Sequence, residues 1–253
     1  MKKIFLVVLI LVSFLSRLSA TTLAPADTNK KDASGKKIGL WKEQFGTNFF
    51  YGNYVDGKRE GLWLGYHPNG IVSNIGEYKN GRMNGNYILI DRAGYYYQHE
   101  TYVNDTLDGL STIYYNGAKI KSETEYKMGL LNGIKKVYYS DGKIQESGIY
   151  KNNLRNGVAK WYFPEGQVSV EYNYVNGSLE GVQKTFYKNG NINSQVKFVN
   201  NVEEGDYNEY FENGKIKITG KYVHGQKEGI WKEVDENGKV VKTEKYKKGE
   251  LQK

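Results

Sequence analysis

The sequence predicts an all-β protein: an elongated, single-layer antiparallel β-meander of tandem 24-residue hairpin repeats. Three observations lead to this prediction. The 253 residues include 23 Tyr and 30 Gly against 3 Pro and no Cys, a balance that favours strands and tight turns. Turn signals separate short apolar runs, and a glycine returns every 24 residues. The turns are too short to hold crossover helices, so neighbouring strands must run antiparallel.

The recurring glycine keeps its period with no insertion. We expect these positions to be structural turn glycines, and they are Gly61, Gly85, Gly109, Gly133, Gly157, Gly181, Gly205 and Gly229. Each follows a residue with a side-chain oxygen. Where that residue is a carboxylate we expect it to cap a turn, at Glu60, Asp108, Glu180, Glu204 and Glu228.

Each repeat contains two turn signals. The first is typified by Asn69-Gly70, and Asn-Gly between apolar runs predicts a hairpin turn that needs positive φ. The second carries Gly, Asn or Asp in every repeat, as at Gly57 and Asp105. Between turns the strands alternate: Ile216 and Ile218 share one face. A β-solenoid stays an alternative, because ladders of identical side chains also suit parallel stacking.

The N-terminal segment is typical of a targeting signal. Residues 1–20 join a basic start to a short apolar core and small residues before Ala20, which predicts a secretory signal peptide cleaved near that residue. An uncleaved anchor is the alternative. We expect a flexible leader over 21–38 and the repeat array, of about nine repeats, over 39–253. The mature protein would be periplasmic or secreted, and without Cys its core depends on packing and sheet bonds.

The repeat resembles a known bacterial family. The segments GLWLGYHPNGIV with EYKNGRMNG, and GIWKEVDENGKV with KYKKG, look like the MORN-variant repeat of proteins often labelled YwqK-like antitoxins. The resemblance covers residues 39–250 and implies a MORN-like twisted antiparallel sheet. Through the family it also implies scaffold or phospholipid-binding roles and an antitoxin label. It offers no catalytic motif to carry over.

The sequence shows no signature of an enzyme. His67, His99 and His224 lie in different repeats without ligand spacing, and no phosphate-binding loop or nucleophile motif is present. We therefore predict no catalytic residues, no cofactor and no metal site. A carboxylate pair hidden among the many Asp and Glu is the remaining enzymatic alternative.

The third repeat departs most from the pattern. In DRAGYYYQHETY, Tyr95, Tyr97 and His99 occupy positions that carry Lys, Glu, Ser or Gln elsewhere, so they are our candidate binding residues. Local repacking against neighbouring tyrosines is the structural alternative.

We expect an exported, non-enzymatic scaffold that binds a protein or a cell-envelope component. Removal of residues 1–20, with Lys2, Lys3 and Arg17, would lower the formal net charge from +8 to +5. This modest excess favours an anionic surface over nucleic acid. The basic C-terminal segment KVVKTEKYKKGELQK suits weak contact with anionic lipid or glycan, or simply protects an edge strand. An immunity protein that caps a toxin is another alternative. The sequence defines neither the ligand nor the oligomeric state.

Overall fold

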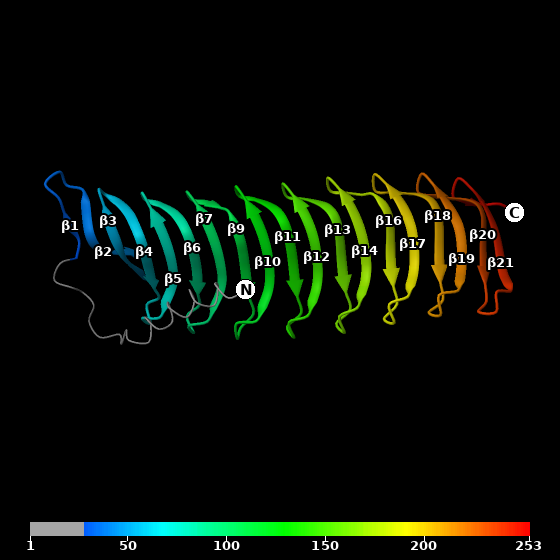
Figure 1. The fold of residues 1–253 in the computed structure, drawn as a ribbon, viewed down its shortest axis with the longest axis horizontal. Helices are drawn as coiled ribbons and strands as arrows, with labels where there is room; N and C mark the ends of the chain where they lie inside the picture. The colour runs from blue at the N-terminus through cyan, green and yellow to red at the C-terminus, as the bar shows by residue number, and fades with distance from the viewer. Residues whose placement is uncertain (1–27) are drawn as a thin grey trace. The chain divides into compact units, whose positions relative to one another are not determined.

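The computed structural model describes residues 28–253. The predicted signal peptide and the first part of the predicted leader lie outside the described residues. The described residues form 22 β-strands and no helix (Figure 1), so they contain no helical segment able to cross a membrane. The strand pairings within residues 28–253 are antiparallel, which confirms the all-β meander and excludes the β-solenoid. The physical reason is the length of the connections, which suffice for tight turns only.

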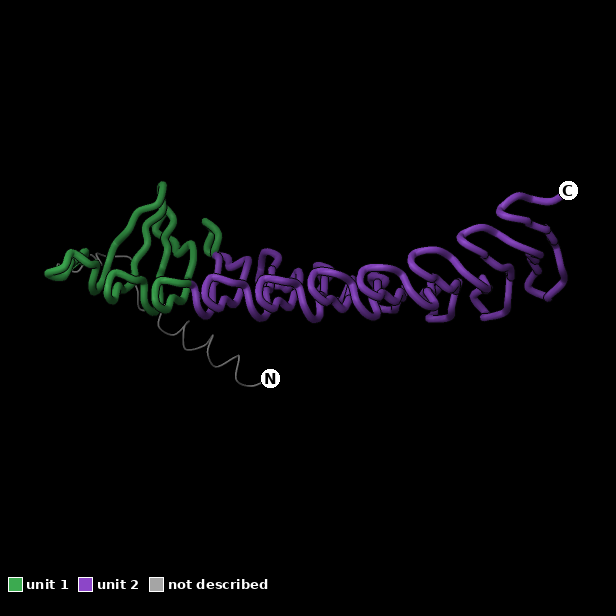
Figure 2. Tube along the Cα trace, turned by 90° about the horizontal axis from the view of Figure 1, so that it is seen from above, with its two compact units in different colours: residues 1–82, 90–94 green, residues 83–89, 95–253 purple. Residues whose placement is uncertain are grey.

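The chain divides into two compact units, coloured separately in Figure 2. Among the described residues, unit 1 comprises 28–82 and 90–94. Its strands are β1 (Lys30–Lys31), β2 (Lys37–Phe45), β3 (Asn48–Val55), β4 (Lys58–Tyr66) and β5 (Val72–Lys79), and β6 (Arg82–Ile90) divides between the units.

Unit 2 comprises residues 83–89 and 95–253, and its strands pair with those that precede and follow them. The strands up to residue 162 are β7 (Tyr96–Val103), β8 (Thr106–Leu107), β9 (Gly109–Tyr114), β10 (Ile120–Lys127), β11 (Leu130–Tyr138), β12 (Ile144–Lys151) and β13 (Leu154–Tyr162). The others are β14 (Val168–Val175), β15 (Ser178–Leu179), β16 (Gly181–Phe186), β17 (Ile192–Val199), β18 (Val202–Tyr210), β19 (Ile216–Val223), β20 (Gln226–Val234), β21 (Val240–Lys247) and β22 (Glu250–Leu251).

The core of unit 1 is aromatic and lies on one face of its sheet. Trp41, Tyr54 and Trp63 are buried, and their rings meet edge to face at 5.7 and 5.2 Å. Gly52 makes room for this packing, because a Cβ there would lie 2.2 Å from the Trp63 ring. With no second layer of described structure on the sheet, large rings over glycine are how this strand pair removes apolar area from water.

The two turns of each repeat differ in how many left-handed residues they contain. At Asn69-Gly70 only the glycine has positive φ, 82°, and the 67–71 segment closes through a bond from the His67 N–H to the Ile71 carbonyl at 2.8 Å. The second turn of the repeat has positive φ at two successive residues, 48° at Asp56 and 75° at Gly57. The longer first loop needs one left-handed residue, whereas a two-residue loop needs two.

The eight recurring glycines are not in turns, which corrects our description of them as turn glycines. All have positive φ, from 70° at Gly61 to 131° at Gly133, but they lie within or at the start of strands. The strand pairing shifts register beside them, as between Gly52 and Asn53 opposite Gly61. They are therefore bulge positions, and only glycine adopts this backbone without strain.

The predicted carboxylate caps are confirmed at all five positions. The Glu60 carboxylate accepts a hydrogen bond from the N–H of Asn80 at 2.7 Å, twenty residues on. The same bond recurs from Asp108 to the N–H of residue 128, from Glu180 to 200, from Glu204 to 224 and from Glu228 to 248. Each repeat thus satisfies a turn N–H of the following repeat, which links neighbouring hairpins.

The part of the predicted leader that is described takes part in the sheet. Lys30 and Lys31 pair with Ile38 and Lys37, and the carbonyl of Lys30 accepts a hydrogen bond from the indole of Trp41 at 3.1 Å. Regular pairing therefore begins before residue 39.

Candidate functional site

The sheet of unit 2 has two faces of different chemistry. Alternate residues of each strand point to opposite faces, so the repeat places the same side-chain type at the same height on every second strand. One face gathers the tryptophans together with tyrosine and glutamate. The other carries exposed aliphatic side chains and lysines, and it also holds Glu123, which lies opposite Lys136 and accepts a hydrogen bond from the Tyr138 hydroxyl.

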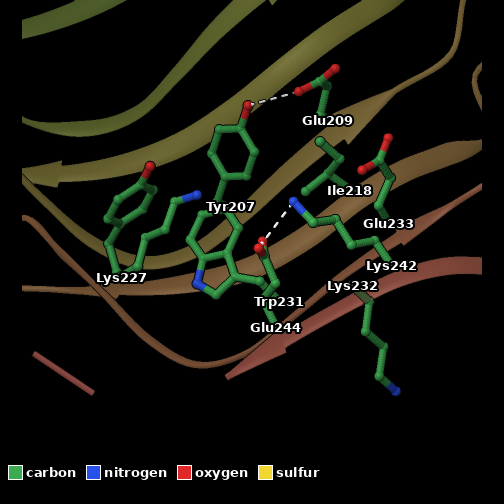
Figure 3. Close-up of a pocket in the computed structure, with 10 residues that line it drawn as sticks. Tyr207, Glu209, Ile218, Lys227, Trp231, Lys232, Glu233, Lys242 and Glu244 are labelled. Carbon is green, nitrogen blue, oxygen red and sulfur yellow. Dashed lines mark hydrogen bonds and ion pairs between the residues drawn. The ribbon is translucent and has the colours of Figure 1, made fainter. Parts of the chain in front are cut away.

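The aromatic face contains a hollow of about 280 Å³ near Trp231 (Figure 3). Trp231 is buried and meets Tyr207 in a stacked arrangement at 5.4 Å and Tyr222 edge to face at 5.1 Å. The hollow is lined by Tyr207, Glu209, Ile218, Tyr222, Lys227, Trp231, Lys232, Glu233, Lys242 and Glu244. Most of the polar groups bind one another or a neighbour: Lys242 pairs with Glu244 at 3.0 Å, and Lys217 pairs with Glu209 at 2.7 Å.

The rings in the hollow pack in the same way as those in the aromatic core of unit 1. A Cβ on Gly220 would lie 2.1 Å from the Trp231 ring, as one on Gly52 would from Trp63, so each indole covers a glycine. The ammonium of Lys227 lies 4.2 Å from the centre of the Trp231 ring. The indole N–H of Trp231 is buried without a hydrogen-bond partner among the described residues. The hollow is therefore a packed aromatic cluster with its rings covered by the chain itself.

Tyrosine hydroxyls on this face are held neutral. Burial, the charge of Glu209 and a 3.2 Å hydrogen bond to that carboxylate raise the pKa of Tyr207 to about 12. Burial and a hydrogen bond to Glu100 likewise raise the pKa of Tyr102 to about 12. A tyrosine with a raised pKa makes a poor general base or nucleophile near pH 7, so these groups hold structure.

The opposite face carries a row of exposed aliphatic side chains, and we call it the ladder face. Its members come from β9, β11, β12, β13 and β16 and are between 39% and 50% exposed. They are Leu110, Ile134, Ile149, Val158 and Val182. Ile134 pairs directly with Ile149 across the sheet, and the neighbour of Val158, Ala159, is buried on the aromatic face. The row is interrupted by Glu125 on β10, which pairs with Leu110, and by Asn173 on β14, which pairs with Val158. A row of exposed aliphatic side chains of this kind is typical of an interaction site.

Lysines flank this row on both sides. Lys136, Lys160 and Lys184 follow Ile134, Val158 and Val182 by two residues on the same strands, and so share their face. Lys160 pairs with Glu171 at 2.9 Å. On the other flank, Lys127 and Lys151 lie at the ends of β10 and β12. Within residues 28–253, Lys127, Lys136, Lys151 and Lys184 form no ion pair.

Carboxylates near the row are already engaged. Glu125 accepts a hydrogen bond from the N–H of Ile134 at 2.8 Å, and Asp108 accepts one from the N–H of Met128 at 3.2 Å. Glu123, opposite Lys136 on this face, accepts a hydrogen bond from the Tyr138 hydroxyl, and Glu171 pairs with Lys160. Because these acids are engaged while several of the lysines form no ion pair among residues 28–253, the surroundings of the row are basic.

The predicted binding residues lie beside this surface without forming one cluster. Tyr97 and His99 are on β7. His99 lies opposite Thr112 and so shares the ladder face, and its Nε2 lies 2.9 Å from Oδ1 of Asn86. Tyr95 precedes β7, so it stands at the loop edge. Tyr95 and Tyr97 are exposed. Tyr96, which is not one of the candidates, packs edge to face on Tyr114 at 4.8 Å.

No part of the described chain forms a metal centre: residues 28–253 hold no group of three or more His, Cys, Asp or Glu placed around one point. The absence of a cofactor and of catalytic residues stays a prediction.

The comparison with protein families is decisive for classification. The family described as "MORN repeat variant" matches residues 59–80, 131–152, 155–176, 179–200, 203–224 and 227–248. These segments cover more than half of the 253 residues. The chain belongs to the MORN repeat variant family. This membership agrees with the tandem hairpins of the structure, while no named relative supports the antitoxin label.

The matched segments leave out two repeats inside the array, 83–104 and 107–128. Both keep the period, since Asn104 and Asp105 retain the left-handed turn at φ 50° and 68°, as does Met128 at 49°. The candidates Tyr95, Tyr97 and His99 fall in the first of these two MORN repeats. The repeats that the family does not match thus include the one that the sequence analysis found most irregular.

The other comparisons add little. No curated protein matches the chain. Among solved structures, a mutated Tc holotoxin pore of Photorhabdus luminescens matches with 12% identity and a TM-score of 0.17. The match covers 86% of this chain, which spans 15% of the length of that protein. This likeness is too weak to support an inference about fold or function.

Our sequence reasoning missed the aliphatic row. The available signal was the residue directly after the recurring glycine, which also repeats every 24 residues. It is Leu110, Ile134, Val158 and Val182 in four successive repeats. The column was easy to overlook, because the bulge at the glycine shifts the alternation that normally separates buried from exposed positions.

Proposed function

We propose that this MORN repeat variant protein is an exported, non-enzymatic scaffold that binds a protein partner through the ladder face of unit 2. The exposed row of Leu110, Ile134, Ile149, Val158 and Val182 carries the proposal, because burying such a row in an interface would remove a large apolar area from water. The paired and packed groups of the aromatic face support a structural role for that side.

The experiment is a pull-down from the native cell envelope with two variants of the full chain. Ile134→Thr/Val158→Thr replaces two ladder residues by side chains of similar β-propensity. Ile230→Thr is the matched control, because Ile230 is exposed at the same repeat position on β20. We expect one protein in stoichiometric amount with the wild type and the control, and its loss with the double variant. Equal recovery by all three would refute the proposal.

A second candidate, contact with an anionic envelope component, rests on a different observation. Lys197, Lys221 and Lys245 occupy the same repeat position on β17, β19 and β21, and all three are exposed. Neighbouring members are two strands, about 9.6 Å, apart. Binding of purified envelope polymer or anionic vesicles that falls with added salt, and is lost in Lys197→Glu/Lys221→Glu/Lys245→Glu, would support it. Binding insensitive to both would exclude it.

A further inference from the structure

We propose that the occupant of the ladder face is an amphipathic α-helix of the partner, with an apolar stripe flanked by acidic side chains. This inference rests on the proposed function and specifies the class of partner. It follows from the spacing of the apolar row, from where the row ends, and from the charges beside it.

The spacing of the row matches a helix that lies across the strands. Leu110, Ile134, Val158 and Val182 stand on every second strand, so successive members are about 9.6 Å apart. Seven residues of α-helix rise about 10.5 Å, which agrees to within about 1 Å per step. Ile149 lies on β12, between β11 and β13. It would contact the partner-helix residue three or four positions after the one that contacts Ile134, and that residue belongs to the same apolar stripe of the helix.

An extended partner strand fits this surface poorly. Residues on one side of a strand repeat every 6.6–6.8 Å or so, which does not match a row spaced at about 9.6 Å. Strand addition also needs an open edge, whereas the row crosses the interior of the sheet, where both neighbours of β11 and β13 are already paired. Contact must therefore come from side chains alone.

Polar residues bound the row at both ends. On β6 the same repeat position is Asn86, whose Oδ1 lies near His99, and on β18 it is Asp206. Between them the row extends over six strand steps, or about 29 Å, with Glu125 on β10 and Asn173 on β14 at intermediate positions. A helix of about 19 residues has this length.

The flanking charges select an acidic helix. Lys136 and Lys184 lie on one side of the row and Lys127 and Lys151 on the other, about 6.6 Å from it along the strands. Burial of the row would bring these ammonium groups toward the helix flanks, where Glu or Asp would pair with them and Lys or Arg would be repelled. Complementary charge also orients the helix and speeds its association at low salt.

The test uses a synthetic 21-residue peptide with Leu at heptad positions a and d and Glu on both flanks. A scrambled peptide of the same composition and a peptide with Lys flanks are the controls. Binding to the full chain is measured by fluorescence anisotropy, and helix formation by circular dichroism. We expect the Glu-flanked peptide to bind, to gain helicity on binding, and to weaken as salt rises.

Two sets of variants locate the contact. In Ile134→Thr/Val158→Thr the affinity should fall about 10-fold, as expected for loss of central interface residues, while Ile230→Thr stays within about twofold of wild type. In Lys136→Glu/Lys184→Glu the preference should reverse toward the Lys-flanked peptide, a result that loss of folding cannot imitate. Binding without a gain in helicity, equal binding of the scrambled peptide, or an equal loss in Ile230→Thr would overturn the proposal, as would no binding at all.

The outcome separates this inference from the proposed function. If the pull-down yields a partner that depends on the ladder face but the peptide fails, the surface binds something other than a helix. If neither depends on the ladder face, the proposed function itself is wrong.

Discussion

Replacing Gly220 by alanine tests the packing of rings over glycine most sharply. The new methyl group would lie 2.1 Å from the Trp231 ring, so the indole must move. Gly220 has no positive φ, so the effect is steric and not conformational. The equivalent residue three repeats earlier, Gly148, faces Ala159, and a methyl group there would meet its nearest neighbours at 3.4 and 3.6 Å. The same substitution should therefore have opposite effects at one position of two different repeats.

The magnitude follows from the area that Trp231 buries. A buried tryptophan removes roughly 200 Å² from water, worth up to about 5 kcal/mol. Partial displacement should lose about half of this, so we expect Gly220→Ala to lower the free energy of unfolding by about 2–3 kcal/mol, within the usual range for overpacking. Gly148→Ala should raise it by about 0.5 kcal/mol, because alanine is less flexible in the unfolded chain.

The assay is urea unfolding followed by far-UV circular dichroism, with Trp231→Ala as the second arm of a double-mutant cycle. In the Trp231→Ala background the cost of Gly220→Ala should nearly vanish, since nothing then occupies the space. An unchanged cost in that background, or equal destabilisation by Gly148→Ala, would refute the reasoning.

Three further predictions concern turns and titrating groups. Met128 holds φ 49° at a turn position that is Asn in five other repeats, so Met128→Asn should stabilise by about 0.5–1 kcal/mol; a lower melting temperature would contradict this. Glu204→Ala removes the acceptor of the His224 N–H, and hydrogen exchange should show lost protection at that amide but not at distant turns. Burial and Glu209 raise the pKa of Tyr207 to about 12, so its hydroxyl stays protonated in the fold while it ionises near pH 10 in the unfolded chain. Stability should therefore fall as pH rises from 10 to 12, and fall less in Tyr207→Phe, when followed by unfolding at fixed temperature.

The architecture could be predicted because the same turn and strand signals recur in every repeat. Glycine, asparagine and aspartate at two turns, with alternating apolar residues between them, leave the antiparallel meander as the simplest solution. The carboxylate caps were predictable for the same reason, since Glu60 and Glu228 hold equivalent places. Local geometry was harder. Gly61 suits a turn and a bulge equally well by its residue type, and only the pairing of β3 with β4 distinguishes them.

The candidate site was only partly visible in the sequence. Tyr97 and His99 were found because they interrupt the pattern, and His99 does lie on the ladder face. Ile134 and Val158 follow the pattern, so a search for deviations could not find them. Their exposure depends on the strands around them, and residue type does not reveal it, because aliphatic side chains normally indicate a buried position.

The central claim is that the ladder face, and not the aromatic face, meets the partner. The most direct measurement places a photo-crosslinking amino acid at residue 134 or at residue 135 of the full chain in its native cells. These adjacent residues on β11 point to opposite faces of the same sheet. Our account predicts a single crosslinked protein from position 134 and none from position 135. A specific adduct from position 135 alone would contradict it.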